Sequence, residues 1–82
     1  MTVYEIHASG SDMSAPKVLA LFCLRDGVVQ SRGKGTLLES IKSDGIVGDG
    51  GEILRIGDGQ RFLDALIHHF NGTTAFLKTR EI

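Results

Sequence analysis

The segment RGKGT at residues 32–36 combines two cations, two glycines and the expected start of a helix. Free backbone amides and the helix dipole make such a start attractive to anions such as phosphate. The spacing is not that of a Walker motif, because a glycine separates the lysine from the threonine. A solvated turn leading into a capped helix is the ordinary interpretation, and anion binding is the alternative. The candidate ligand-binding residues here are Arg32, Lys34, Gly35 and Thr36.

Two histidines are further candidates for ligand binding, His7 and His69. His7 shares a strand face with Glu5, and a carboxylate beside an imidazole can form an acid/base pair. We expect that face to be the solvated one, where charged groups are usually just hydrated. His69 lies at the edge of an apolar helical stripe, whereas the adjacent His68 projects away from it, so the two do not converge on one metal ion. The sequence predicts no catalytic residue and no metal ligand.

The remaining polar groups lack the spacing of known sites. Asp44, Asp49 and Glu52 do not follow the calcium-binding pattern of an EF-hand. No serine stands in a G-x-S-x-G elbow. Cys23 lies inside an apolar run and is expected to be a buried, unreactive thiol. No cofactor is predicted.

The N-terminal part of the chain reads as strands. Residues 2–8 alternate between apolar and polar side chains, which predicts a half-buried strand. Residues 9–16 have the composition of a loop. The apolar run at residues 18–24 suits a strand that is covered on both faces. Asp26-Gly27 follows at once and is a strong hairpin signal, because both central residues of a type I′ turn need positive φ.

Two helices are expected in the remainder. Thr36 and Glu39 fit a capping box at the start of a short helix that ends at Asp44-Gly45. Asp58 is the expected N-cap of a second helix. That helix gathers its apolar residues into one stripe and closes at Asn71-Gly72. The stripe consists of Phe62, Leu63, Leu66, Ile67 and Phe70.

The other segments complete the expected order β-β-β-α-β-α-β. Residues 46–51 read as a loop, residues 52–56 as a short strand and residues 73–79 as a final strand, followed by a frayed tail at residues 80–82. The sequence predicts a single α+β domain spanning residues 1–82, with a small, mainly antiparallel sheet and two helices packed on one face. The crossing helix would allow the last strand to pair parallel to its predecessor.

The amino-acid composition and net charge limit which classes of function we expect. The formal net charge is −1, so the broad positive field of most nucleic-acid-binding domains is not expected. Neither a transmembrane stretch nor a signal peptide is visible, and the expected location is the cytoplasm. We therefore predict a small non-catalytic protein-interaction or assembly module, with a homodimer as the expected form. The alternative is a small anion- or phosphate-binding domain, or a small enzyme, that uses the 32–36 turn with His7 or His69.

Overall fold

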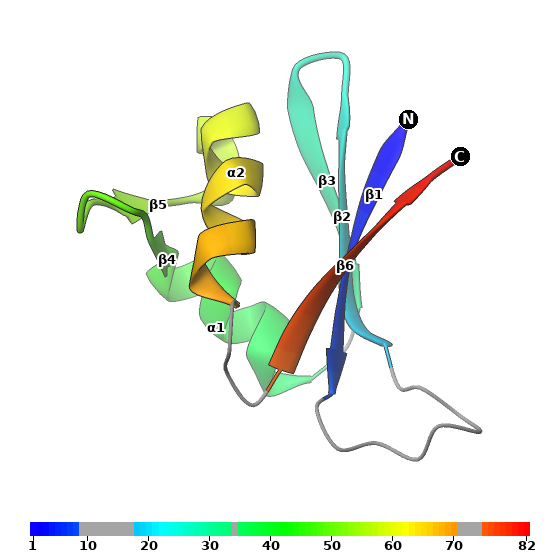
Figure 1. Cartoon of the computed structure of the whole chain (residues 1–82). Coiled ribbons are helices and arrows are strands. Elements are labelled where there is room, and N and C mark those ends of the chain that lie inside the picture. Colours follow the sequence, from blue (N-terminus) through cyan, green and yellow to red (C-terminus); the bar gives the residue numbers. More distant parts are fainter. Residues whose placement is uncertain (9–17, 34, 71–74) are drawn as a thin grey trace.

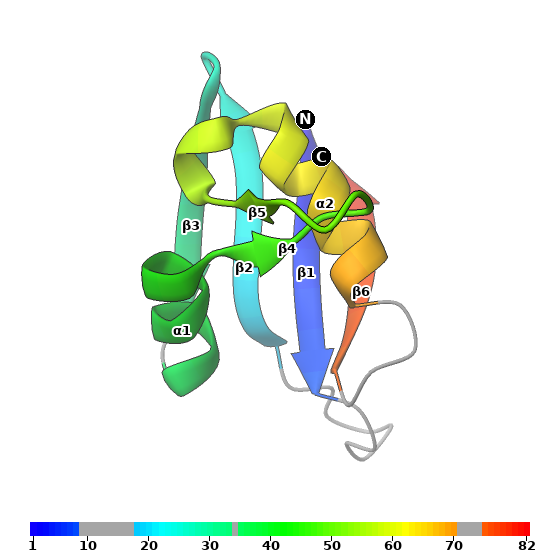
Figure 2. The same cartoon turned by 90° about the vertical axis from the view of Figure 1, so that its left-hand side faces the viewer.

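A four-stranded antiparallel sheet forms one layer of the molecule, and two helices with a small hairpin form the other (Figures 1 and 2). This computed structural model describes residues 1–8, 18–33, 35–70 and 75–82. The elements are β1 (Thr2–Ala8), β2 (Val18–Arg25), β3 (Val28–Gly33), α1 (Thr36–Asp44), β4 (Ile46–Val47), β5 (Ile53–Leu54), the 3₁₀ helix η1 (Ile56–Asp58), α2 (Gln60–His69) and β6 (Ala75–Glu81). The predicted α+β class, with both helices on one face of the sheet, is confirmed.

The hairpin of β2 and β3 has the predicted turn. Asp26 and Gly27 have φ values of 54° and 79°, as a two-residue primed turn requires. The expectation that β2 is covered on both faces is wrong. Phe22 is buried on the face toward the helices, whereas Leu21 and Cys23, on the opposite face, are only partly buried.

The core lies between the sheet and α2. Ile6 and Phe22 of the sheet pack with Phe62 and Leu66 of α2 in one cluster of buried side chains. The rings of Phe22 and Phe62 meet edge to face, with centroids 5.4 Å apart. Each such buried side chain contributes on the order of 1.5–3 kcal/mol. This cluster therefore fixes which face of the sheet receives the helices.

The N-caps of both helices differ from the predicted residues, Thr36 and Asp58. Thr36 is the first helical residue rather than the cap, and Gly35 stands before it with φ 106° and without a side-chain hydrogen bond. Asp58 belongs to η1, where its carboxylate accepts from the backbone amide of Arg55 at 2.8 Å. Gly59 is the N-cap of α2, with φ 64°. At both helix starts the chain turns through a positive φ, which glycine adopts more readily than Thr or Asp.

The apolar stripe of α2 is confirmed apart from one residue. Phe62, Leu63, Leu66 and Phe70 are buried, but Ile67 is 52% exposed. At about 100° per residue, Ile67 lies at the margin of the stripe. The predicted helix end at residues 71–72 lies outside the described residues.

The segment expected to be a loop contains a strand. β4 pairs antiparallel with β5 through Ile46–Leu54 and Val47–Ile53, and this hairpin forms a separate small sheet that packs beside α2. The predicted strand at residues 52–56 is therefore shorter than expected and lies outside the main sheet. The suggested parallel pairing of the last strand with it is wrong, because β6 pairs antiparallel with β1.

The expected frayed tail is part of a strand. Val3 pairs with Arg80 and Thr2 with Glu81, and the amide of Ile82 donates to the carbonyl of Met1 at 2.9 Å. The Thr2 hydroxyl donates to Glu81 at 2.6 Å, and the N-terminal ammonium lies 3.0 Å from the same carboxylate. These hydrogen bonds, the one from Thr2 first, hold the pKa of Glu81 below its usual value.

Candidate functional site

The sheet has a second face, turned away from α1 and α2 (Figure 1). Side chains alternate along each strand, so the residues between those of the core project there. We call this set the outer face. It comprises Val3, Glu5 and His7 of β1, Val18, Leu21, Cys23 and Arg25 of β2, Val28, Gln30 and Arg32 of β3, and Phe76, Lys78 and Arg80 of β6.

The strand register arranges the outer face in rows. One row runs Gln30, Cys23, Val3, Arg80 across β3, β2, β1 and β6, and the next runs Arg32, Leu21, Glu5, Lys78. In these two rows the central strands contribute three apolar side chains and Glu5, whereas the outer strands contribute three cations and Gln30. Three strand spacings separate β3 from β6, a distance of about 14 Å.

The middle of the outer face is hollowed. Val3, Leu21 and Cys23 line a concavity of about 390 Å³, together with Arg32 and Arg80. Val3 is only 8% exposed, and the other two side chains are partly buried. The exposed face of an antiparallel sheet is usually polar. An apolar floor at this place therefore departs from an ordinary solvated face.

Charge is distributed unevenly between the two layers. The outer face carries four cations, Arg25, Arg32, Lys78 and Arg80, against the carboxylate of Glu5. Residues 35–70, which form the opposite layer, carry six carboxylates, Glu39, Asp44, Asp49, Glu52, Asp58 and Asp64, against three cations, Lys42, Arg55 and Arg61. The near-neutral net charge conceals this polarity.

Glu5 joins two residues of the outer face. Its Oε1 lies 3.1 Å from Nε2 of His7, and its Oε2 forms an ion pair with Nε of Arg80 at 3.2 Å. The expectation that this face is solvated is wrong for Glu5 and His7, whose side chains are only 14% and 7% exposed. Glu5 engages Arg80 through Nε rather than through the terminal nitrogens of the guanidinium, and the Arg80 side chain is 58% exposed.

His7 is packed rather than accessible. Its ring stacks on Phe76, with centroids 5.2 Å apart and planes 15° from parallel. Its Nδ1 is buried and has no hydrogen-bond partner among the described residues. A general base must reach the proton that it abstracts. This geometry favours a structural role for His7, which helps to hold Glu5 in position.

The residues of the 32–36 turn separate in space. Arg32 projects from the outer face, opposite Leu21. Gly35 and Thr36 begin α1, on the other side of the sheet. Lys34 lies outside the described residues. The free amides of the helix start and the Arg32 guanidinium therefore do not form one anion site.

His69 and His7 lie on opposite sides of the sheet. His69 is half-buried near the end of α2, edge-on to Phe70 with centroids 4.9 Å apart, so the sheet separates it from His7. The adjacent His68 is exposed, with Nδ1 3.6 Å from a carboxylate oxygen of Asp49. Within the described ranges, no three potential metal ligands gather at one point.

Sequence reasoning predicted the last strand over residues 73–79 but missed its continuation through Arg80 and Glu81. Phe76, Lys78 and Arg80 alternate at period two, and the continuation of this alternation into the supposed tail was an available signal for a longer strand. Their partners on β1 could not be read from it, because strand register depends on tertiary packing.

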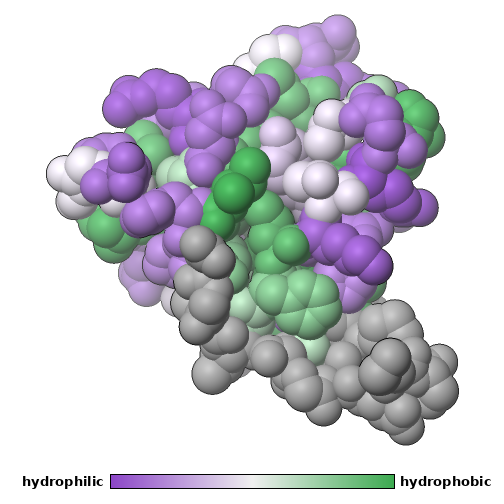
Figure 3. Space-filling model, viewed as in Figure 1, coloured by the Kyte–Doolittle hydropathy of each residue, from purple (hydrophilic) through white to green (hydrophobic). Residues whose placement is uncertain are grey.

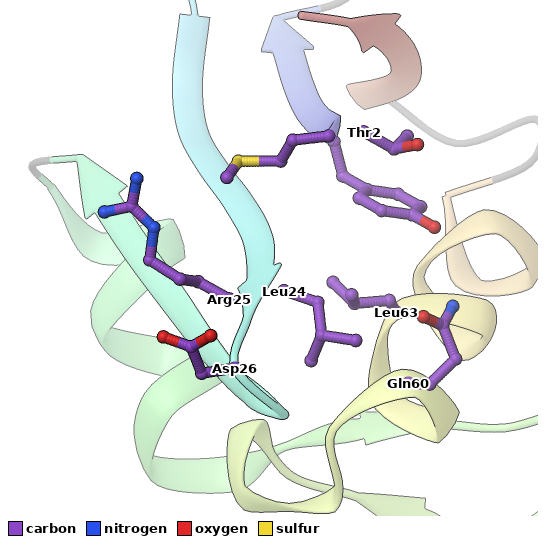
Figure 4. A pocket seen from close by; sticks show the side chains of 8 residues that line it. Thr2, Leu24, Arg25, Asp26, Gln60 and Leu63 are labelled. Atoms are coloured by element: carbon purple, nitrogen blue, oxygen red, sulfur yellow. The ribbon is translucent and has the colours of Figure 1, made fainter.

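A second hollow, of about 490 Å³, opens between the end of the β2–β3 hairpin and the start of α2 (Figure 4). Leu24 and Leu63 form its apolar part, and Arg25, Asp26 and Gln60 lie around it. The Gln60 amide already donates to Asp64 at 2.9 Å. Its two opposite charges give this hollow no single electrostatic preference, in contrast to the outer face.

An apolar strip follows the boundary between the two layers. Figure 3 shows hydrophobic surface between α2 and β6, with hydrophilic surface on both sides. These two elements contribute the exposed hydrophobic residues Ile67 and Phe76. Because β6 is an edge strand of the described sheet, this strip is a second surface where another chain could contact the protein.

Comparison of the chain with protein-family models, with curated proteins and with solved structures finds no significant match. In the part of the chain that the structure describes, neither helix has the length and apolar character needed to cross a bilayer.

Proposed function

We propose that this protein is a non-catalytic interaction module that binds a protein partner with its outer face. The supporting observation is the apolar floor of Val3, Leu21 and Cys23, which lies in a hollow on the face turned away from both helices. An apolar surface with a polar rim is the usual composition of a protein-binding site. Arginine is enriched among the residues that dominate binding energy, and here Arg32 and Arg80 flank the floor.

The Glu5–His7 pair supports binding better than catalysis. Its imidazole is buried under Phe76, and its main contact orients a carboxylate that holds Arg80. The alternative, an anion-binding domain or small enzyme built on the 32–36 turn with His7 or His69, receives less support. Such a site would require Arg32 and His7, on the outer face, to meet residues on the helix side of the sheet.

A heterologous partner fits the outer face better than a second copy does. A two-fold dimer through this face would bring the cations of β3 and β6 close to those of the partner copy, and like charges in an interface cost several kcal/mol. A homodimer would more readily use the strip between α2 and β6. Light scattering coupled to size-exclusion chromatography tests this. A dimer that dissociates on substitution of Leu21 would contradict our choice of partner.

Affinity capture from extracts of the source cells tests the function. The bait is the intact protein, and the test variant is Leu21→Thr, since threonine preserves strand propensity while removing apolar surface. The matched control is Ile53→Thr in β5, in the opposite layer and 54% exposed. We expect a specific partner to be retained by the wild type and the control and lost with Leu21→Thr. Equal retention by all three proteins would refute the outer face as the binding site.

A further inference from the structure

We propose that the partner presents an acidic amphipathic helix, which lies along β1 and β2 on the outer face. This inference rests on the proposed function and specifies the chemistry of the partner. It follows from three features of the outer face: its width, the spacing of its apolar residues, and the placement of cations on both sides.

The width suits one helix. An α-helix with its side chains is 10–12 Å across, and the outer strands β3 and β6 are separated by about 14 Å. A helix over the two central strands therefore fills the floor and places its flanks beside the outer strands. The hollow that is lined by Val3, Leu21 and Cys23 provides room for its apolar side chains.

The spacing along the strands also matches. Leu21 and Cys23 are two residues apart on one strand, a rise of about 6.7 Å. Positions i and i+4 of a helix are about 6 Å apart along its axis. An apolar stripe at helical spacing can therefore contact successive floor residues, with Val3 opposite Cys23 completing the contact surface.

Charge selects an acidic partner. Arg32 borders the floor on the β3 side, and Lys78 and Arg80 border it on the β6 side. The carboxylate that the outer face contains, that of Glu5, is largely buried and already engaged with Arg80 and His7. A ligand with carboxylates on both flanks of its apolar stripe would pair with Arg32 on one side and with Lys78 and Arg80 on the other.

The floor favours a peptide over a nucleic acid. Stacking of bases needs aromatic platforms, whereas the floor is formed by the aliphatic Val3 and Leu21 with Cys23. Phe76 is the exposed aromatic of this face among the described residues, and one side of its ring is occupied by His7. The helices α1 and α2 of a second copy are not suitable ligands, because their apolar faces are buried in the core.

The test uses synthetic helical peptides of about 18 residues, stapled so that helix formation is not limiting. One carries a leucine stripe flanked on both sides by glutamate, and its matched control carries glutamine in place of every glutamate. Fluorescence anisotropy measures binding to the intact protein at low and high salt. We expect the glutamate peptide to bind at least about tenfold more tightly than the glutamine peptide, with an advantage that declines as salt rises.

Protein variants then locate the contacts. Arg32→Gln and Arg80→Gln should each weaken the glutamate peptide about threefold, the size expected for an exposed ion pair. Arg61→Gln, which removes an exposed cation in the opposite layer, should leave binding unchanged. Amide chemical shifts should move at Val3, Leu21 and Cys23. Movement confined to α2 and the free edge of β6 would instead overturn the proposal.

Three results separate this inference from the function on which it depends. Equal binding of the two peptides, or no binding of either, overturns the acidic helix. A single-stranded oligothymidylate that binds the outer face more tightly than the glutamate peptide overturns it in favour of a nucleic acid. If the cellular partner is still lost with Leu21→Thr in those cases, the interaction module stands and only the partner's chemistry is wrong.

Discussion

The two faces of the sheet are built from the same four strands but differ in what covers them. The inner face, directed toward the helices, packs Ile6 and Phe22 against α2 at 0–1% exposure. The outer face leaves Leu21 and Cys23 partly accessible between rows of cations. Since adjacent residues of one strand serve both faces, a single apolar run supplies both the folding core and the floor that we propose for binding. Stability and partner affinity should therefore depend on alternate residues of β2.

The largest expected effect is on the inner face. Phe62→Ala removes a fully buried ring that contacts Phe22 and should lower the free energy of unfolding by about 3–5 kcal/mol. Urea denaturation followed by circular dichroism measures the change. A decrease in the free energy of unfolding below about 1 kcal/mol would show that packing against the inner face is not the main source of stability.

A backbone position in the helix layer should have the next largest effect. Gly45 ends α1 with φ 75°, and an added Cβ would lie 2.6 Å from the carbonyl oxygen of Leu54. Gly45→Ala should therefore cost about 2–3 kcal/mol. Gly51→Ala is the matched control, because Gly51 has φ 83° with open space around it. If thermal unfolding shows the same loss of stability for the two variants, the close approach to the Leu54 carbonyl oxygen does not contribute to the cost.

On the outer face, the charged cluster should contribute a smaller amount. Glu5→Gln removes the carboxylate that bridges His7 and Arg80 and should cost about 1–3 kcal/mol. A double-mutant cycle with Arg80→Gln isolates the pair. We expect a coupling below about 1 kcal/mol, because Arg80 is 58% exposed. Coupling above that value would mean that the outer face stabilises the fold more than we propose.

Leu21→Thr provides the sharpest contrast between the faces. The substitution should lower stability by only about 1 kcal/mol, because Leu21 is partly exposed, while partner affinity falls about tenfold. Denaturation and binding are measured on the same preparation. A stability loss as large as that of Phe62→Ala would remove the distinction between core and floor.

The smallest effect concerns the edge of the sheet. The pKa of Glu81 is lowered from its usual 4.5, chiefly by the hydrogen bond from Thr2. A carboxyl group with a depressed folded pKa stabilises the fold above its unfolded pKa, and this contribution is lost as pH falls through the folded pKa. Glu81→Gln should therefore lower the melting temperature slightly near neutral pH and not in acid. A difference that persists unchanged in acid would contradict the assignment.

Local sequence patterns predicted most of the helices and strands. Most of the wrong predictions concern which strands pair and in which register. Asp26-Gly27 specified its hairpin through backbone conformation alone, and the stripe of α2 specified its buried face. The pairing of β4 with β5 was not visible, because two-residue strands carry almost no periodic signal. Similarly, Gly35 and Gly59 are the N-caps of α1 and α2 in place of the expected Thr36 and Asp58. The direction from which the chain enters each helix decided the backbone conformation at these positions, and that direction depends on tertiary structure.

The candidate site was predicted only in part. Glu5 and His7 share a strand, so their proximity followed from alternation. Arg80 and Phe76 lie beside them on the neighbouring strand β6. No pattern within residues 2–8 or within residues 75–81 specifies how β1 and β6 align. The cations that surround the floor come from three strands, so their convergence depended on the order of strands in the sheet, which composition does not encode.

The closing contact between Met1 and Ile82 affects how this protein should be handled. Both residues line the hollow of the outer face, and their backbones are hydrogen-bonded to each other (Figure 1). An affinity tag or fluorescent fusion joined at Met1 or Ile82 would therefore stand at the mouth of the hollow and obstruct an incoming ligand. A small dye attached there would instead report occupancy directly. Immobilisation is better directed to the exposed side of α1, which leaves the opposite surface unobstructed.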